Sequence, residues 1–294
     1  MIKKTILILG KNNILYEYLM DKIPSSKYNI TVLTKRNFDI RNPHNFRLKL
    51  DTIKPDFIIN LMHYNKNKML DEFIMQNSLT NLFLLQYGLP NLTIINLSYA
   101  GIFGKYCKLI PLEEESVANL EYDEVIKPRN EMYFSMYLSE LFLNRLYKYS
   151  CVKTIYNLRI SDMFGGDYNL YNTQSNDIIK KMINNKKVLI NDKSEFQPIY
   201  AKDVAVAIST LLCQRKFKNN IFNFHATTPT ITKGDFVGEI RGFVNSGSKI
   251  KSKDEAINCD KLDQGRNLKR IGIDKRPLND MLKDYFKNEL KLIK

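Results

Sequence analysis

Histidine and cysteine, the side chains that most often bind zinc and other transition metals, are scarce in this sequence. No histidine has a second ligand residue three or four positions away, and no two cysteines form a Cys-x-x-Cys pair. The residues concerned are His44, His63, His225, Cys107, Cys151, Cys213 and Cys259. We therefore expect no metal site, and we expect the cysteines to be free thiols that mostly pack in the interior.

Long apolar runs are also missing. No stretch approaches the ~20 residues needed to cross a bilayer, and the apolar run at the N-terminus ends at Gly10 in a pattern typical of a buried strand rather than of a signal peptide. We expect a cytoplasmic protein without a membrane partner.

Acidic residues are fewer than basic ones: the sequence has 31 Asp and Glu and 45 Lys and Arg, which gives a formal net charge of +14. The positive charge is spread along the chain, and its densest group is Lys180, Lys181, Lys186 and Lys187. Diffuse charge of this kind is typical of a solvated surface, so nucleic acid is not the expected partner.

Short apolar runs alternate with amphipathic segments over the first 160 residues. The runs cover residues 5–9, 29–33, 57–61, 92–97 and 153–160. Continuous apolar strands separated by helices are typical of a parallel sheet that helices cover on both faces. The sequence therefore predicts an α/β fold with a doubly wound, Rossmann-like sheet.

The regular alternation ends near residue 165. Helices are expected at 176–184 and 201–212, a short strand at 188–190, and a polar stretch at 246–261. We expect a nucleotide-binding domain over residues 1–165. Residues 166–294 are expected to form a small C-terminal substrate lobe, interleaved with the end of the sheet.

Five segments carry a family resemblance. They read NFDIRNP at 37–43, KPDFIIN at 54–60, NSLTNL at 77–82, NLRISDMFG at 157–165 and QPIYAKDVAVAI at 197–208. In order and spacing they resemble the extended short-chain dehydrogenase/reductase family of the nucleotide-sugar type, and within it most resemble the dTDP-4-dehydrorhamnose reductases. The resemblance implies a nicotinamide cofactor and hydride transfer to a 4-keto-sugar nucleotide.

The turn after the first strand departs from the family's Gly-x-x-Gly-x-x-Gly pattern. Gly10 keeps the first glycine, whereas Asn13 and Tyr16 stand in place of the second and third. In the family's pattern, the second glycine lets the backbone approach the pyrophosphate, and the third lets the helix and the strand pack closely. Asn13 tolerates a left-handed backbone, but the ring of Tyr16 is expected to fill space that the pyrophosphate needs. We expect dinucleotide binding to be weak or absent.

The residues that bear on which dinucleotide would bind follow the second strand, and they are Lys35, Arg36, Asp39 and Ile40. If one binds, Lys35 and Arg36 are placed to meet a 2′-phosphate and so favour NADP; the alternative is that they are a solvated loop pair. The resemblance implies that Asp39, with Ile40 beside it, lies at the adenine.

The resemblance implies a catalytic Tyr and, four residues later, a Lys that lowers the pKa of that Tyr. Aligned on Asn130 and Glu140, these two positions hold Met132 and Met136. Methionine can neither donate a proton nor carry a charge. Tyr133 is the nearest substitute, although a shift of one residue turns a side chain by about 100° on a helix.

The family's third catalytic position is a Ser or Thr after the fourth strand. Here it falls on Tyr99, preceded by Ser98. The candidate catalytic residues are therefore Tyr133, Ser98 and Tyr99.

Three hypotheses follow. The first is a degenerate reductase or epimerase relative that lacks the usual hydride-transfer chemistry and acts as a binding or regulatory partner in surface-sugar metabolism, with a sugar nucleotide, another protein or a second copy of itself as partner. The second is an active, NADP-dependent reductase, epimerase or dehydratase that uses Tyr133, Tyr99 or a residue of the lobe such as Tyr168 or His225. The third is a nucleic-acid-binding protein on the same fold.

Overall fold

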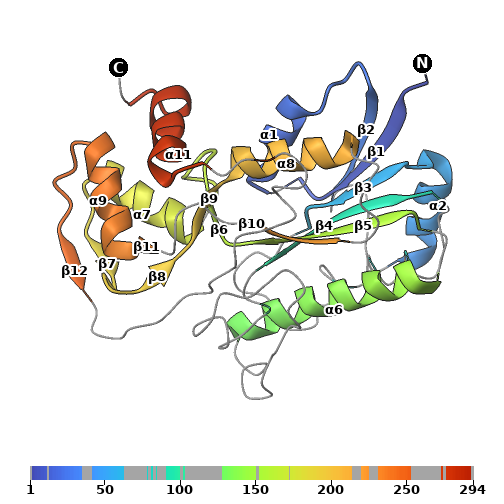
Figure 1. Cartoon of the computed structure of the whole chain (residues 1–294), viewed down its shortest axis with the longest axis horizontal. Coiled ribbons are helices and arrows are strands. Elements are labelled where there is room, and N and C mark those ends of the chain that lie inside the picture. Colours follow the sequence, from blue (N-terminus) through green and yellow to red (C-terminus); the bar gives the residue numbers. More distant parts are fainter. Residues whose placement is uncertain are drawn as a thin grey trace.

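The computed structural model describes most of the chain. The described residues are 2–11, 13–34, 42–62, 78, 81, 84, 91–99, 102, 128–149, 152–171, 173–213, 220–224, 231–252, 273 and 276–292. Within them the elements form a layered α/β body with a smaller lobe beside it (Figure 1).

A six-stranded parallel sheet lies at the centre of the molecule, with the strand order β10-β5-β4-β3-β1-β2. The strands are β1 (Lys4–Leu9), β2 (Tyr28–Leu33), β3 (Phe57–Asn60), β4 (Thr93–Tyr99), β5 (Thr154–Ile160) and β10 (Asn220–Phe224). The chain leaves β1 toward β2 on one side and returns to β3 on the other. In sheets of this kind ligands bind beyond the carboxyl ends of the strands, at the point where the strand order reverses, which here lies between β1 and β3.

Helices cover both faces of the sheet (Figure 1). On one face lie α1 (Leu15–Lys22) and α8 (Ala201–Cys213), and on the other lie α2 (Pro43–Ile53) and α6 (Pro128–Tyr149). Successive strand residues point to opposite faces, so Ile6 and Ile8 pack beneath α1 and α8, whereas Leu7 and Leu9 pack beneath α2 and α6.

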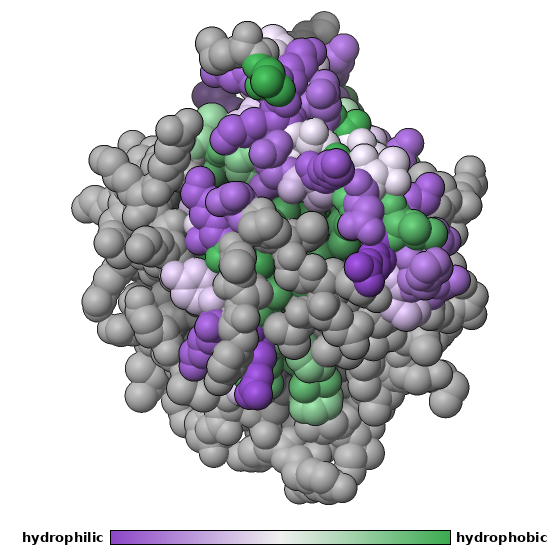
Figure 2. All heavy atoms as spheres, turned by 90° about the vertical axis from the view of Figure 1, so that its right-hand side faces the viewer, coloured by the Kyte–Doolittle hydropathy of each residue, from purple (hydrophilic) through white to green (hydrophobic). Residues whose placement is uncertain are grey.

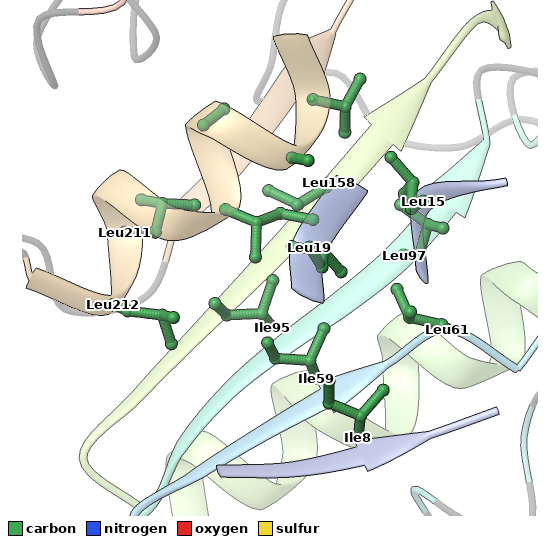
Figure 3. Close-up of a cluster of buried hydrophobic side chains, with 14 of the residues drawn as sticks. Ile8, Leu15, Leu19, Ile59, Leu61, Ile95, Leu97, Leu158, Leu211 and Leu212 are labelled. Carbon is green, nitrogen blue, oxygen red and sulfur yellow. The ribbon is translucent and has the colours of Figure 1, made fainter. Parts of the chain in front are cut away.

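The core beneath α1 and α8 is built mainly from aliphatic side chains of the strands and of both helices (Figure 3). Leu19 of α1 and Leu211 of α8 meet Ile59, Ile95 and Leu158 of the strands. Burying one such side chain stabilises the fold by about 1.5–3 kcal/mol, so this layer holds the first helix, and with it the turn that precedes the helix, firmly on the sheet.

The lobe has its own core, which is rich in aromatic side chains. Its helices are α7 (Gln174–Ile183), α9 (Lys233–Phe243) and α11 (Leu278–Asp284), and α11 continues into the π-helical turn η3 (Tyr285–Glu289). Three two-stranded pairs accompany them: β6 (Asp162–Phe164) with β9 (Pro198–Tyr200), β7 (Val188–Ile190) with β12 (Ile250–Ser252), and β8 (Glu195–Phe196) with β11 (Ile231–Thr232). In the core Phe164 stacks on Tyr200 at a centroid distance of 5.3 Å, and Phe196 meets Phe236 edge-on at 5.1 Å.

The predicted doubly wound parallel sheet is confirmed, and each of the five expected strands agrees with an observed one to within two residues at either end. The helices expected at 176–184 and 201–212 correspond to α7 and α8. The sequence analysis missed β10, the sixth strand of the sheet. Because α8 and β10 follow residue 165 in the chain but belong to the layers of the sheet, the division into two domains stays a prediction.

On the side of the molecule at the right of Figure 1, the surface contributed by described residues is mostly hydrophilic, with small hydrophobic areas between (Figure 2). Within the described part of the chain, no helix combines the length and the apolar character that a membrane span needs.

Candidate functional site

The turn from β1 into α1 passes very close to the end of β3. Gly10 has a φ of +91°, and a Cβ atom added there would lie 3.2 Å from the carbonyl carbon and oxygen of Leu61 and from the amide nitrogen of Met62. A side chain would fit this position neither by conformation nor by space. Gly10 therefore keeps the tight turn of a nucleotide-binding fold.

Asn13 closes the same turn from inside. Its side chain is 4% exposed; Nδ2 donates to the carbonyl of Leu61 at 3.3 Å, and Oδ1 accepts from the amide of Leu15 at 2.9 Å. The first amides of a helix are the groups that a doubly wound fold offers to a phosphate. The carboxamide of Asn13 thus already satisfies one of them, and it would have to give up that bond for a pyrophosphate to take its place.

Tyr16 follows at the start of α1 and is half-buried against the core cluster beneath α1 and α8. The exposed Lys11 places Nζ 5.5 Å from the centroid of the Tyr16 ring, a cation–π arrangement. The expectation that this ring fills the pyrophosphate space stays a prediction.

Several predicted site residues lie outside the described part of the chain. They are Lys35, Arg36, Asp39, Ile40 and His225. Met132 belongs to α6, but its side chain is also outside the described part. Tyr168 is described and is half-buried beyond the end of β6.

Ser98 and Tyr99 are neighbours at the carboxyl end of β4, and strand alternation separates them. Tyr99 packs against the core cluster beneath α1 and α8. Ser98 is 0% exposed and follows Asn96 on the opposite, α6-facing side, where its hydroxyl has no hydrogen-bond partner among the described residues. The structure therefore does not place these two candidates in one site.

Tyr99 instead interacts electrostatically with Asp162 of β6 and Tyr133 of α6. Burial raises the pKa of the Tyr99 phenol well above its usual range, and the negative charge of Asp162 and the phenol of Tyr133 raise the pKa further. Tyr99 and Tyr133, which are far apart in the sequence, thus influence each other electrostatically, together with a carboxyl group that the sequence pattern did not single out.

Asp162 lies between the sheet and the lobe. Its Oδ2 accepts from the amide and the hydroxyl of Ser175 at 2.6 and 2.5 Å, and its Oδ1 accepts from the amide of Gln174 at 3.2 Å, so the carboxylate caps the first turn of α7. Burial raises the pKa of Asp162 and outweighs the opposite effects of these hydrogen bonds and of the charge of Lys233. The only signal in the sequence is an acidic residue just after a buried strand.

The other face of the sheet carries a buried polar layer under α6. Asn60, Asn96 and Asn157 lie in register on β3, β4 and β5, and their carboxamides are joined at 3.0 and 3.1 Å. Beside them, Arg159 of β5 and Glu140 of α6 form an ion pair at 2.8 Å, with side chains 4% and 2% exposed. This layer fixes how α6 sits on the sheet.

Met136 faces the same interior from one turn before Glu140 and is 3% exposed. The resemblance requires a lysine at this position, with its ammonium beside the cofactor. The structure instead places an apolar thioether in a buried position, where it can pack but cannot hold a charge.

The turn and α6 together do not fit a dinucleotide as the structure stands. Asn13 satisfies an amide that the pyrophosphate would need, and Met136 replaces the residue that would contact the ribose. We therefore derive no reaction step through a nicotinamide cofactor.

Residues 6–224 match the model of the NAD dependent epimerase/dehydratase family. The chain belongs to this family. The match covers well over half of the 294 residues and confirms the resemblance that the five sequence segments indicate.

Solved structures of the family share the fold over nearly the whole chain. A dTDP-4-dehydrorhamnose reductase from Bacillus anthracis, solved in complex with NADP, is 18% identical with a TM-score of 0.79, and the alignment covers 98% of this chain and 100% of that chain. A UDP-glucose 4-epimerase from Thermotoga maritima, solved with UDP-glucose, is 17% identical with a TM-score of 0.78, covering 98% and 99%. At this identity the likeness shows the fold alone.

No protein with a curated description matches the sequence. Within the described residues, no group of three or more His, Cys, Asp and Glu side chains is arranged to hold a metal ion.

Proposed function

We propose that this chain is a degenerate member of the epimerase/dehydratase family that lacks the usual hydride-transfer chemistry and acts as a binding or regulatory partner in surface-sugar metabolism. The observation that carries the proposal is Met136, buried at 3% exposure where the family's mechanism needs a charged lysine. Without that charge, nothing at this position lowers the pKa of a catalytic tyrosine.

The closed turn supports the same conclusion. Asn13 bridges the end of β3 and the start of α1 with two hydrogen bonds, so dinucleotide binding has to break an existing arrangement. A sugar nucleotide, held mainly between the sheet and the lobe, is the ligand class that remains compatible with the retained fold.

Calorimetric titration of the purified chain with NADPH, NADH and a panel of UDP- and dTDP-sugars tests this function, together with a turnover assay on 4-keto-sugar nucleotides. We expect dinucleotide binding to be weak or undetectable and turnover to be absent. General acid catalysis alone contributes about 10²–10⁴-fold to rate, so the loss should be large. Submicromolar affinity for NADPH, or robust turnover, would contradict the proposal.

One observation favours a second candidate, a working enzyme with an altered catalytic set. Tyr99, at the carboxyl end of β4, interacts electrostatically with Asp162 and Tyr133, and a phenol and a carboxyl group can act as general acid and base. If the wild type turns over any sugar nucleotide and Tyr133→Phe abolishes that turnover while Tyr137→Phe does not, the catalytic tyrosine has moved by one residue and this second function replaces the first.

A further inference from the structure

The outer face of the β7–β12 pair is unusually basic. The two strands are parallel, with Val188 opposite Ile250 and Leu189 opposite Lys251. Val188 and Ile190 are buried in the core of the lobe, so the alternate residues of β7 point outward. Leu189 is 46% exposed. Around it lie four exposed lysines: Lys186, Lys187, Lys249 and Lys251.

These four lysines form no ion pair with any residue in the described part of the chain. Nearby, Lys181 of α7 does form one, with Asp177 at 2.6 Å. Continuing the register by one residue places Lys187 opposite Lys249, and like charges directly opposite in a sheet are destabilising. The face therefore carries positive charge that the rest of the described fold does not compensate.

Protection of a strand edge explains only part of this pattern. A lysine on an edge strand discourages pairing between molecules, and Lys251 alone would supply that. Lys186 and Lys187 instead add charge just before β7, and Leu189 adds an exposed apolar side chain between the charges. An apolar contact ringed by uncompensated charge of one sign is suited to a partner of opposite charge.

We propose that this face binds an acidic, extended segment of a partner protein, which pairs with β12 as an added strand. Among the described residues β12 pairs with β7 alone. Lys249 and Lys251 are two residues apart, which is the repeat of side chains on one face of an extended chain. Carboxylates at alternate positions of an added strand would therefore meet both lysines. The inference rests on the proposed function, in which the chain acts as a binding partner, and it specifies the kind of protein segment that the chain binds.

A synthetic peptide with Glu and Val at alternate positions is the probe, and its comparison is a peptide of the same composition with the glutamates in one block. Binding to the full chain is measured by fluorescence anisotropy at low and high salt. We expect the alternating peptide to bind at least about tenfold more tightly than the block peptide, and more weakly at high salt. Equal binding of the two peptides would overturn strand addition.

Charge reversal locates the site. Lys249→Glu with Lys251→Glu should weaken binding of the alternating peptide at least about tenfold. The matched control is Lys27→Glu with Lys153→Glu, which makes the same change of charge at exposed positions on the other half of the molecule and should change binding less than about twofold. An equal loss in both variants would show that only net charge matters, and would overturn the site.

Two further probes separate the competing partners. Vesicles of phosphatidylcholine with phosphatidylglycerol and a single-stranded oligonucleotide are titrated in the same way, and tighter binding of either than of the peptide would overturn a protein partner. The NADPH titration is repeated on Lys249→Glu with Lys251→Glu. It should match the wild type, so a failure of the peptide experiment would leave the proposed function of the nucleotide side untouched.

Discussion

Asn13 uses its carboxamide inside the turn where the family's pattern has a glycine. A glycine at this position would leave the first amides of α1 open, whereas the carboxamide accepts from Leu15 and donates to Leu61. Gly10, three residues earlier, cannot change in the same way because an added Cβ atom would lie 3.2 Å from the backbone of Leu61 and Met62. The turn thus keeps its shape, while the amide of Leu15 donates to the side chain of Asn13 and not to a ligand.

Asn13→Gly should therefore raise the affinity for NADPH, by about tenfold if one backbone hydrogen bond to the pyrophosphate is regained. The same change should lower the free energy of unfolding by about 1–2 kcal/mol, because two hydrogen bonds are lost and glycine is more flexible in the unfolded chain. Calorimetry and urea denaturation measure the two effects. Asn91→Gly, at an exposed residue with a φ of +64°, is the matched control and should leave the affinity unchanged. If Asn13→Gly binds NADPH no more tightly than the wild type, the side chain of Asn13 does not obstruct dinucleotide binding.

At the scale of elements, α6 illustrates which features the sequence could predict. Asn130 and Glu140, the two positions aligned with the family's pattern, both lie on α6. The ion pair with Arg159 gives a physical reason for a buried glutamate there. Breaking such a pair on one side is costly, about 3–5 kcal/mol, because a buried charge is left uncompensated. The pair therefore keeps α6 in register on the sheet.

Two features escaped the sequence analysis for different physical reasons. The β10 strand, Asn220–Phe224, has asparagines at both its first and fourth positions, so it lacks the continuous apolar pattern of β1 and β3. Asp162 is separated from Tyr99 by 63 positions, and only the parallel pairing of β4 with β5 brings the two strand ends together. The opposite directions of Ser98 and Tyr99, by contrast, follow from strand alternation once β4 is known to extend to residue 99.

Asp162 also accepts hydrogen bonds from the first two amides of α7, and its pKa gives a prediction for that helix. Because the pKa is raised in the folded state, folding favours the protonated carboxyl group. The resulting stabilisation is present below the ordinary Asp pKa of 3.8 and is lost as the pH rises through the raised value. Asp162→Asn, which stays neutral, should therefore gain melting temperature relative to the wild type between pH 4 and pH 7.

Thermal melts of both proteins across that pH range provide the test. Asp162→Ala is the control, because it removes the acceptor of the Gln174 and Ser175 amides and should cost about 1 kcal/mol whether or not the carboxyl group would be ionised. If the melting-temperature difference between wild type and Asp162→Asn does not change with pH, the pKa of Asp162 is not raised in the folded state.

At the scale of the whole molecule, the end of the chain joins the lobe to the sheet. Glu289 of η3 accepts hydrogen bonds from the hydroxyl of Tyr18 on α1 and from the hydroxyl of Tyr200 on β9. One turn earlier, Tyr285 donates to the carbonyl of Gly166 at 2.8 Å, and the amide of Gly166 donates to the hydroxyl of Tyr18. A cavity of about 330 Å³ lies beside this junction. The helix that follows the turn at Gly10 is thus tied to the C-terminal segment.

Glu289→Ala should loosen this connection. Two partly buried phenols would lose their acceptor, at a cost of about 1–3 kcal/mol, and the amides of α1 and α11 should exchange with deuterium faster than in the wild type because fewer contacts hold the two helices together. Hydrogen exchange followed by mass spectrometry measures this, and Lys287→Ala, exposed on the same π-helical turn, is the matched control. Tyr18→Phe removes one donor to Glu289 and the acceptor of the Gly166 amide, so it should accelerate exchange in the same two helices. If Glu289→Ala accelerates exchange in α11 alone, the C-terminal segment packs on the lobe without stabilising α1, and the link between the two halves of the molecule must lie elsewhere.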